Sequence, residues 1–203
     1  MFSRSERLFL RPAWSEDIPD LHAAISDQRV VSNLTSVAWP QAVEDARDFV
    51  NRPRDRRHPA FLITMPGARG SRIVGAIGLR EDAECAELVY WLAPEVWGRG
   101  FATEAARAVL RLAHTLGHRE VRAIHFVDNP ASGRVLSKLG FQPVGNVSMQ
   151  YSHGRGCAAP AREYRSRLDG PGNIDGDPAP QDDGARRLRF CGVPPVISVA
   201  LVA

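Results

Sequence analysis

The fold of this chain is decided by residues 87–105, which read Glu87-Leu-Val-Tyr-Trp-Leu-Ala-Pro-Glu-Val-Trp-Gly-Arg-Gly-Phe-Ala-Thr-Glu-Ala105. A short apolar run rich in strand-forming residues stops at Pro94, and two glycines, Gly98 and Gly100, follow it. An alanine-rich segment with helical periodicity begins after the glycines. Strand, glycine loop and helix start in this order predict an anion site, because exposed N–H groups and the positive end of the helix dipole meet there.

The glycine loop differs from two common nucleotide-binding loops. A P-loop requires the spacing Gly-x-x-x-x-Gly-Lys-Ser/Thr, and no lysine follows Gly98 and Gly100. A dinucleotide fingerprint requires a third glycine and an acidic residue at the end of the next strand. The two glycines instead predict a loop whose backbone approaches a ligand with no Cβ in the way. The alternative interpretation is a plain turn between a strand and a helix.

A second block lies about thirty residues further along the chain. Residues 121–127 predict a buried strand, and Asp128-Asn-Pro-Ala-Ser-Gly-Arg-Val-Leu-Ser-Lys-Leu-Gly-Phe141 predicts a short helix. Asn129 is a good N-cap, Pro130 suits the first helical position, and Gly140 suits the C-terminal cap.

The two blocks together resemble the GNAT N-acetyltransferase superfamily. Trp97-Gly-Arg-Gly-Phe-Ala102 is similar to the Gln/Arg-x-x-Gly-x-Gly/Ala motif that binds the pyrophosphate of acetyl-coenzyme A, with Trp97 in place of the usual Gln or Arg. Asn129-Pro-Ala-Ser132 is similar to the segment whose Asn and Ser face the pantetheine arm. The opening Glu6-Arg-Leu-Phe-Leu-Arg-Pro12 and the Tyr90-Trp-Leu92 strand are most similar to the ribosomal-protein N-terminal (Rim-type) acetyltransferase branch.

The resemblance covers about residues 5–168 and implies the GNAT fold. This is an α+β (mixed α/β) domain with a central, mixed, mostly antiparallel and splayed β-sheet flanked by helices. The residue patterns give a matching order of elements: strand 7–12, helices 15–25 and 41–50, strands 60–65, 72–79 and 85–93, a helix from 101 to 116, strand 121–127, helix 129–140, and short strands 141–145 and 162–168. We expect one domain over residues 1–168, followed by a Gly/Pro/Asp-rich linker and C-terminal tail over residues 169–203 that is partly disordered.

The resemblance also implies a cofactor site between two splayed parallel strands that end near Ala93 and Val127. The pantetheine arm would lie between these strands, within reach of Asn129 and Ser132. Backbone N–H groups freed by the splay, on Tyr90, Trp91 and Leu92, would bind the thioester carbonyl. The pyrophosphate would be bound by the backbone of Gly98, Arg99, Gly100, Phe101, Ala102 and Thr103.

Direct acetyl transfer to an amine requires a neutral amine and a protonated leaving thiolate. Glu87 is the candidate base, because an acid on an apolar central strand is costly unless it is exposed or used; the alternative is a surface charge at a strand edge. Ser132 and Tyr151 are the candidate acids. On a regular strand Glu87 and Tyr90 point to opposite faces. An α-amine, with a pKa of about 7.7–8.0, needs less help from a base than a lysine at about 10.4.

Composition argues against several other classes of protein. The chain has 203 residues, is 44% hydrophobic and has a net charge of only +3, with a pI near 9.0. Its densest basic cluster, at residues 52–57, contains no aromatic residues, so we expect no nucleic-acid partner. The first residues lack the apolar core of a signal peptide, and no run approaches the roughly 20 apolar residues of a membrane helix.

The cysteines and histidines predict neither a disulfide framework nor a metal site. Cys85, Cys157 and Cys191 are odd in number and far apart, which favours a reduced cytoplasmic location. His114 and His118 are four residues apart on a predicted helix, but no third ligand joins them at ligand spacing.

We therefore predict an acetyl-CoA-dependent N-acetyltransferase, monomeric or homodimeric, without a metal. Its acceptor would be a primary amine, either a protein N-terminal α-amine or a small-molecule amine. One alternative is a non-catalytic acyl-CoA-binding module that acts as a sensor or regulator. A second is a basic nucleic-acid-binding protein, which the pI permits and the lack of a clustered aromatic and basic surface disfavours.

Overall fold

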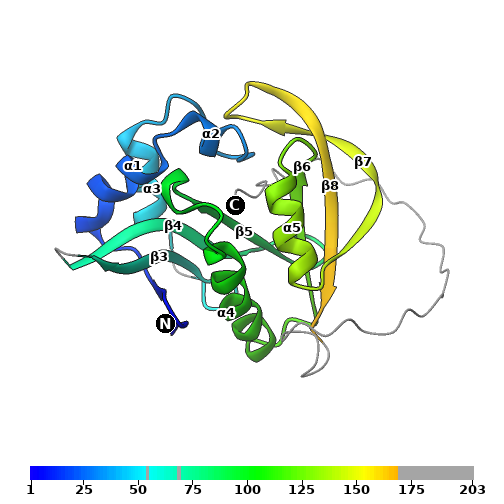
Figure 1. Ribbon diagram of the computed structural model, residues 1–203, viewed down its shortest axis with the longest axis horizontal. Helices are drawn as coiled ribbons and strands as arrows, with labels where there is room; N and C mark the ends of the chain where they lie inside the picture. The colour runs from blue at the N-terminus through cyan, green and yellow to red at the C-terminus, as the bar shows by residue number, and fades with distance from the viewer. Residues whose placement is uncertain (54, 68–69, 169–203) are drawn as a thin grey trace.

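A computed structural model describes residues 1–53, 55–67 and 70–168 of the chain (Figure 1). The linker and tail predicted at residues 169–203 lie outside the described residues. No helix within the described part is long and apolar enough to cross a membrane.

The described residues form one eight-stranded sheet with the strand order β1-β2-β3-β4-β5-β6-β8-β7. The strands are β1 (Ser3–Arg4), β2 (Phe9–Arg11), β3 (Ala60–Gly67), β4 (Gly70–Arg80), β5 (Ala86–Leu92), β6 (Glu120–Phe126), β7 (Gln142–Ser152) and β8 (Cys157–Arg167). Neighbours in this sheet are antiparallel except β5 and β6, which are parallel. The predicted fold class, a mixed and mostly antiparallel sheet flanked by helices, is confirmed.

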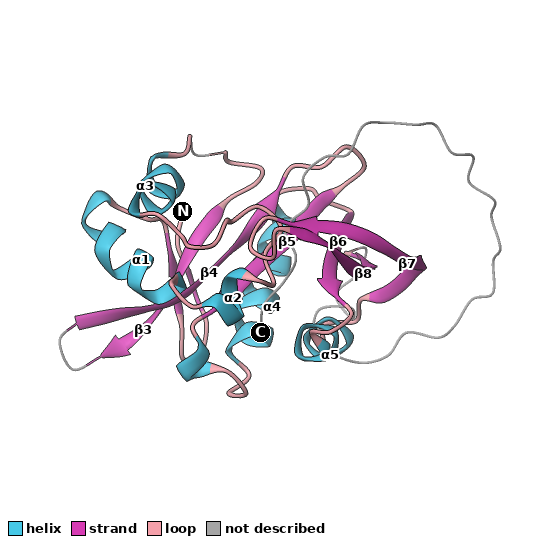
Figure 2. Ribbon diagram, turned by 90° about the horizontal axis from the view of Figure 1, so that it is seen from above, coloured by secondary structure: helices cyan, strands magenta, loops and turns pink. Residues whose placement is uncertain are grey.

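The parallel pair at the centre of the sheet is joined only at its beginning. Ala86 pairs with Val121 and Glu87 pairs with Arg122, and the register between the two strands ends there. Both strands continue for several residues beyond this point, so their carboxyl-terminal halves are splayed. Seen from above, β3 and β4 extend to one side of β5, whereas β6, β8 and β7 lie on the other (Figure 2). Helix α4 (Phe101–Thr115) provides the crossover that a parallel connection requires.

Helices cover both faces of the sheet. One face carries α1 (Ile18–Ile25), which follows the 3₁₀ turn η1 (Ser15–Asp17), together with α2 (Gln28–Val31) and α3 (Val43–Asn51). The other face carries α4 and α5 (Pro130–Lys138). Because side chains alternate along a strand, Tyr90 of β5 packs in the α4 core whereas its neighbour Trp91 packs in the α1 core.

The predicted capping signals act as expected in the second half of the domain. The Asn129 side chain caps α5 by accepting a hydrogen bond from the Ser132 N–H at 3.3 Å, and Pro130 occupies the first helical position. Gly117 and Gly140, directly after the last turns of α4 and α5, have φ of 86° and 79°. This left-handed conformation costs glycine little, which explains why both helices end there.

The structure differs from the predicted elements in four places. The two short final strands are a long hairpin, β7 and β8; β7 faces mostly solvent, so it lacks the apolar alternation by which strands are recognised. Strand β1 and helix α2 were missed because they are too short to show periodicity. The predicted helix 15–25 begins with the 3₁₀ turn η1, whose N-cap is Trp14; the Trp14 N–H donates to Asp17 Oδ2 at 2.8 Å.

Candidate functional site

The glycine loop leads from the 3₁₀ turn η2 (Pro94–Val96) into the first turn of α4. Gly98 and Gly100 have φ of 72° and 79°, and Gly100 is the N-cap of α4. The first intrahelical bond runs from the Glu104 N–H to the Gly100 carbonyl at 3.0 Å. The N–H groups of residues 101–103 therefore have no acceptor within the helix, and they can bind an anion.

The carboxyl end of β5 directs backbone N–H groups toward the side where β6 departs. The Ala93 N–H donates to the Val74 carbonyl of β4 at 2.9 Å. Backbone groups of successive strand residues point to alternate sides, so the N–H groups of Leu92 and Tyr90 point away from β4. The Trp91 N–H points toward β4. Of the three backbone groups predicted to bind a thioester carbonyl, only those of Tyr90 and Leu92 have the required direction.

Trp97 connects the glycine loop to the splayed strand. Its indole N–H donates to the Leu92 carbonyl at 2.7 Å, and its ring packs against the cores on both faces of the sheet. The guanidinium of Arg29, on α2, lies 5.7 Å from the centroid of the same ring. Trp97, which replaces the usual Gln or Arg of the motif, is therefore partly buried and lines the cleft described next. Its indole N–H, the one donor of the side chain, is bound to Leu92.

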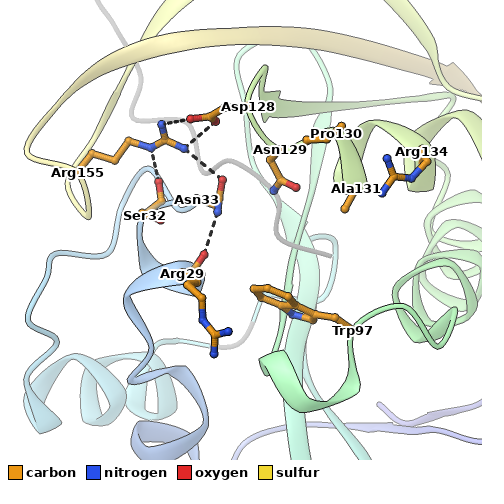
Figure 3. A pocket seen from close by; sticks show the side chains of 10 residues that line it. All are labelled: Arg29, Ser32, Asn33, Trp97, Asp128, Asn129, Pro130, Ala131, Arg134 and Arg155. Atoms are coloured by element: carbon orange, nitrogen blue, oxygen red, sulfur yellow. Dashed lines mark hydrogen bonds and ion pairs between the residues drawn. The ribbon is translucent and has the colours of Figure 1, made fainter.

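A cleft of about 510 Å³ lies beside Trp97, between α2 and the start of α5 (Figure 3). Figure 3 shows the α2 side and the α5 side facing each other across it. Its lining residues are Arg29, Ser32, Asn33, Trp97, Asp128, Asn129, Pro130, Ala131, Arg134 and Arg155. The cleft is thus lined by α2 and the residues after it, the loops that follow β5 and β6, the start of α5 and the turn between β7 and β8.

Arg155, in the turn between β7 and β8, binds two other segments at the rim of this cleft, residues 32–33 and residues 126–128, and we call this set of contacts the Arg155 clasp. Its guanidinium donates to both oxygens of Asp128, at 2.7 and 2.9 Å, to the Ser32 carbonyl at 2.6 Å and to Asn33 Oδ1 at 3.2 Å. It also lies 4.4 Å from the centroid of the Phe126 ring. The hydrogen bonds from Arg155 hold the pKa of Asp128 below its usual range, so the carboxyl stays ionised near neutral pH.

Ser132 is fully buried at the start of α5, where three predicted site residues meet. The Asn129 amide donates to Ser132 Oγ at 3.1 Å. Burial raises the pKa of Tyr90 well above its ordinary value, and the nearby Ser132 hydroxyl opposes that rise only in part. The phenol therefore stays protonated, and Tyr90 of β5 meets Ser132 of α5 across the splay.

Glu87 lies at the opposite end of β5 from the glycine loop. It is completely buried, and its Oε2 accepts hydrogen bonds from Arg80 at 2.6 Å and from Arg122 at 3.2 Å. Burial raises the pKa of this carboxyl, and the two arginines oppose the rise. The structure places Glu87 in ion pairs with Arg80 and Arg122, and Glu87 is not among the residues that line the cleft, so its role as a base stays a prediction.

Tyr151, the other predicted acid, lies on β7 and is not among the residues that line the cleft. Its side chain is 53% exposed, and its ring makes an edge contact with His153 at 5.2 Å between centroids. The structure therefore brings together Ser132, Asn129 and Tyr90 but leaves Tyr151 apart from them.

A second cleft, of about 300 Å³, lies beside Gly100 on the outer side of the loop. Its lining residues are Glu6, Arg7, Gly100, Thr103, Glu104, Arg107 and Lys138. Arg99 is exposed and its guanidinium lies 4.9 Å from the centroid of the Phe101 ring, so its charge remains accessible to a ligand. Sequence reasoning missed Arg7, Arg107 and Lys138, because they approach the loop from three separate elements.

The histidine and cysteine side chains that the structure describes do not gather at either cleft. His125 is buried against Tyr164, and burial lowers its pKa. Burial also raises the pKa of the Cys85 thiol to about 11. Across the described ranges, no three His, Cys, Asp or Glu side chains are grouped as a metal site would require.

Comparison with known proteins identifies the family. A model of the family described as Acetyltransferase (GNAT) domain matches residues 7–142. This range includes the glycine loop, the splayed strands and α5. The chain therefore belongs to the GNAT acetyltransferase family.

One curated relative and two solved structures agree with this assignment. The chain is 30% identical over 169 residues to the uncharacterized N-acetyltransferase YoaA of Bacillus subtilis (strain 168), covering 79% of this chain and 93% of that protein. It matches an acetyltransferase (GNAT family) from Bacillus anthracis with a TM-score of 0.70 and 24% identity, covering 84% of this chain and all (100%) of that one. It matches RimL, a ribosomal L7/L12 alpha-N-protein acetyltransferase in complex with coenzyme A, with a TM-score of 0.68 and 20% identity, covering 83% and 99%. At these identities the two structures support the fold.

Proposed function

We propose that this protein transfers an acetyl group directly from acetyl-CoA to a primary amine, and that the amine is the α-amine of a peptide or a small molecule. The observation that carries the proposal is the split parallel pair, whose register ends at Glu87 and Arg122 beside a glycine-capped helix. RimL, which shares this fold, is an alpha-N-protein acetyltransferase and binds coenzyme A. Membership of the GNAT family supports acetyl transfer as the reaction.

The splay and the glycine loop together suit an extended thioester that ends in phosphates. The N–H groups of the loop and of the first turn of α4 would bind the pyrophosphate. The pantetheine arm would extend between the carboxyl ends of β5 and β6, past Asn129. The N–H of Leu92 or Tyr90 would donate to the thioester oxygen as negative charge develops on it, which lowers the barrier to attack.

The charges in the cleft favour an acceptor amine that loses its proton easily. Asp128 is the carboxylate among the lining residues, and Arg155 occupies both of its oxygens. The described residues that line the cleft therefore include no unengaged carboxylate, which favours proton transfer through water. An α-amine with a pKa of about 7.7–8.0 is partly neutral at pH 7.5, whereas a lysine amine at about 10.4 is almost wholly charged. This difference favours α-amines over lysine side chains.

Ser132 is our candidate for assisting the leaving thiolate. Its Oγ accepts a hydrogen bond from the Asn129 amide, and a hydroxyl can donate as well as accept. As the C–S bond breaks, the Ser132 hydroxyl can donate a hydrogen bond to the developing thiolate, and the thiolate takes up the proton that water carries away from the amine. Ser132 keeps its own proton in this step, and Tyr90 beside it stays protonated.

The first test is the binding of acetyl-CoA, measured by isothermal titration calorimetry with the wild type and Gly100→Trp. A tryptophan at Gly100 is strained by the φ of 79° and places its ring in the loop that would hold the pyrophosphate. We expect micromolar binding by the wild type and at least a roughly hundredfold loss in the variant. Gly117→Ala is the matched control, because Gly117 has a similar φ of 86° and open space around it at the far end of α4.

Turnover would then be measured as thiol release with peptides that carry free or blocked N-termini. Release with free α-amines and none with blocked ones supports the proposal. Tight binding of acetyl-CoA without turnover on α-amines, lysine side chains or small amines would instead indicate a non-catalytic acyl-CoA-binding module. Absence of binding by the wild type would refute both.

A further inference from the structure

The first turn of α4 contains a carboxylate where an anion is expected to bind. Glu104 lies one turn after the N-cap Gly100, and both residues line the second cleft. A negative charge a few ångströms from a bound phosphate opposes its binding by Coulomb repulsion. The site can therefore hold an anion well only if the charge of Glu104 is neutralised.

The bend between β1 and β2 supplies that neutralisation from the other end of the sequence. Glu104 Oε1 accepts hydrogen bonds from Ser5 Oγ at 2.7 Å and from the Arg7 N–H at 2.8 Å. Glu104 Oε2 accepts from Arg7 Nε at 2.8 Å and pairs with a terminal guanidinium nitrogen at 2.7 Å. Burial alone would raise the pKa of Glu104, but these hydrogen bonds together lower it, so the group is ionised and fully engaged.

Arg7 also contacts the loop itself. Its second terminal nitrogen donates to the Arg99 carbonyl at 3.2 Å, and its guanidinium lies 4.5 Å from the centroid of the Phe101 ring. A Cβ placed on Gly100 would lie 3.7 Å from Arg7. One side chain therefore contacts Arg99 and Phe101, on either side of Gly100, and the carboxylate of the turn that follows them. Such multiple contacts fix the direction of the N–H groups before a ligand arrives.

The charges that line the second cleft depend on Arg7. The cleft has three cations, Arg7, Arg107 and Lys138, against the carboxylates of Glu6 and Glu104. Removing Arg7 leaves two charges of each sign and uncovers Glu104 beside the loop. The Arg7 side chain is 47% exposed, so the guanidinium keeps a face toward solvent while it holds Glu104.

We propose that Arg7 is a positioning residue for the anionic part of the cofactor: it neutralises Glu104 and fixes residues 99–101, so that the first turn of α4 can bind phosphates. This inference rests on the proposed function. It adds a residue outside the glycine loop and predicts that Glu104 is unfavourable for binding whenever Arg7 is absent.

The test is a double-mutant cycle on coenzyme A affinity, measured by calorimetry with the wild type, Arg7→Gln, Glu104→Gln and the double variant. We expect Arg7→Gln to weaken binding about tenfold, within the usual range of coupling between sites. The double variant should regain several-fold of that loss, because the uncovered carboxylate is gone. Arg47→Gln, which removes the cation of an exposed Arg–Glu pair on α3, is the matched control and should bind as the wild type does.

A phosphate-free ligand separates positioning from general stability. S-acetylpantetheine, titrated by NMR, should bind the wild type and Arg7→Gln alike, because it lacks the groups that the loop holds. Melting temperatures identify any variant that fails to fold; if Arg7→Gln does, Arg7→Lys, which keeps the charge but loses the forked contacts, takes its place.

Two results would overturn the inference. The first is an equal loss of affinity for coenzyme A and S-acetylpantetheine, which would assign Arg7 a purely structural role. The second is a double variant that binds no better than Arg7→Gln. A wild type that binds neither ligand would refute the proposed function itself, and the inference with it.

Discussion

The two ends of strand β5 differ sharply although Glu87 and Leu92 are only five positions apart in the sequence. At the amino end, β5 pairs with β6, and Glu87 is buried between Arg80 and Arg122. At the carboxyl end the ladder with β6 is absent, backbone N–H groups point into the splay, and the glycine loop follows. The ion pairs join β4, β5 and β6 at the last point where the parallel strands meet. We infer that the closed end stabilises the sheet so that the open end can leave backbone groups free for a ligand.

Removing Arg122 should disrupt the closed end of β5, and we expect it to have the largest effect of the substitutions considered, a loss of stability. Arg122 also pairs with Asp82 at 3.0 Å, so Arg122→Met leaves two buried carboxylates short of a cation. We expect a loss of about 3 kcal/mol in the free energy of unfolding near pH 8, typical of a broken buried pair. Urea unfolding measures this loss, and the affinity of the folded variant for acetyl-CoA should not change.

The pH dependence of that loss follows from the pKa of Glu87. Burial already raises this pKa, and removing Arg122 raises it further, because Arg122 is one of the groups that oppose the rise. A carboxyl with a raised folded pKa contributes full stability below its unfolded pKa, about 4.3, and loses it as the pH rises through the folded pKa. The effect of Arg122→Met should therefore be smaller near pH 5 than near pH 8. Arg47→Met, in an exposed pair, should show almost no loss at either pH; weaker cofactor binding with normal stability would contradict the division between the two ends.

The open end was largely predictable from sequence because its signals are local. Each signal acts through its immediate neighbours, so a short stretch of sequence is enough to recognise it. These signals are Gly98 and Gly100, the cap Asn129 and the apolar run of β5. The same holds for the ends of α4 and α5, which the positive φ of Gly117 and Gly140 explains.

The remaining site features depend on contacts between distant segments, and no window of sequence contains them. Arg155 reaches Asp128, 27 residues away, and Ser32, 123 residues away. The sequence predicts Glu87 as a base because an acid on an apolar strand is unusual, and this role stays a prediction. Its two arginine partners lie on neighbouring strands, and only the register of the sheet reveals their positions.

Ser132→Ala tests the chemistry of the open end and should have the next largest effect. If the Ser132 hydroxyl assists the leaving thiolate, its removal should lower kcat about a hundredfold, the lower range for general acid catalysis, with little change in KM for acetyl-CoA. Steady-state thiol release measures both constants. Tyr151→Phe provides the comparison, since Tyr151 lies outside the cleft lining; a larger fall in kcat for this variant than for Ser132→Ala would make Tyr151 the acid.

Asp128→Asn should have the smallest effect, because it alters one exposed partner of the Arg155 clasp. The Asp128 side chain is 63% exposed, and Arg155 keeps its bonds to Ser32 and Asn33, so we expect a loss of only about 0.5 kcal/mol in stability. The contribution of Asp128 to stability changes with pH in the opposite direction to that of Glu87. Hydrogen bonds from Arg155 lower the pKa of Asp128, so its contribution is present above the unfolded pKa, about 3.9, and is lost as the pH falls through the folded pKa. Urea unfolding of wild type and variant should therefore converge in acid and differ slightly at neutral pH. A difference that grows toward low pH would show that the clasp does not depend on the ionised carboxylate.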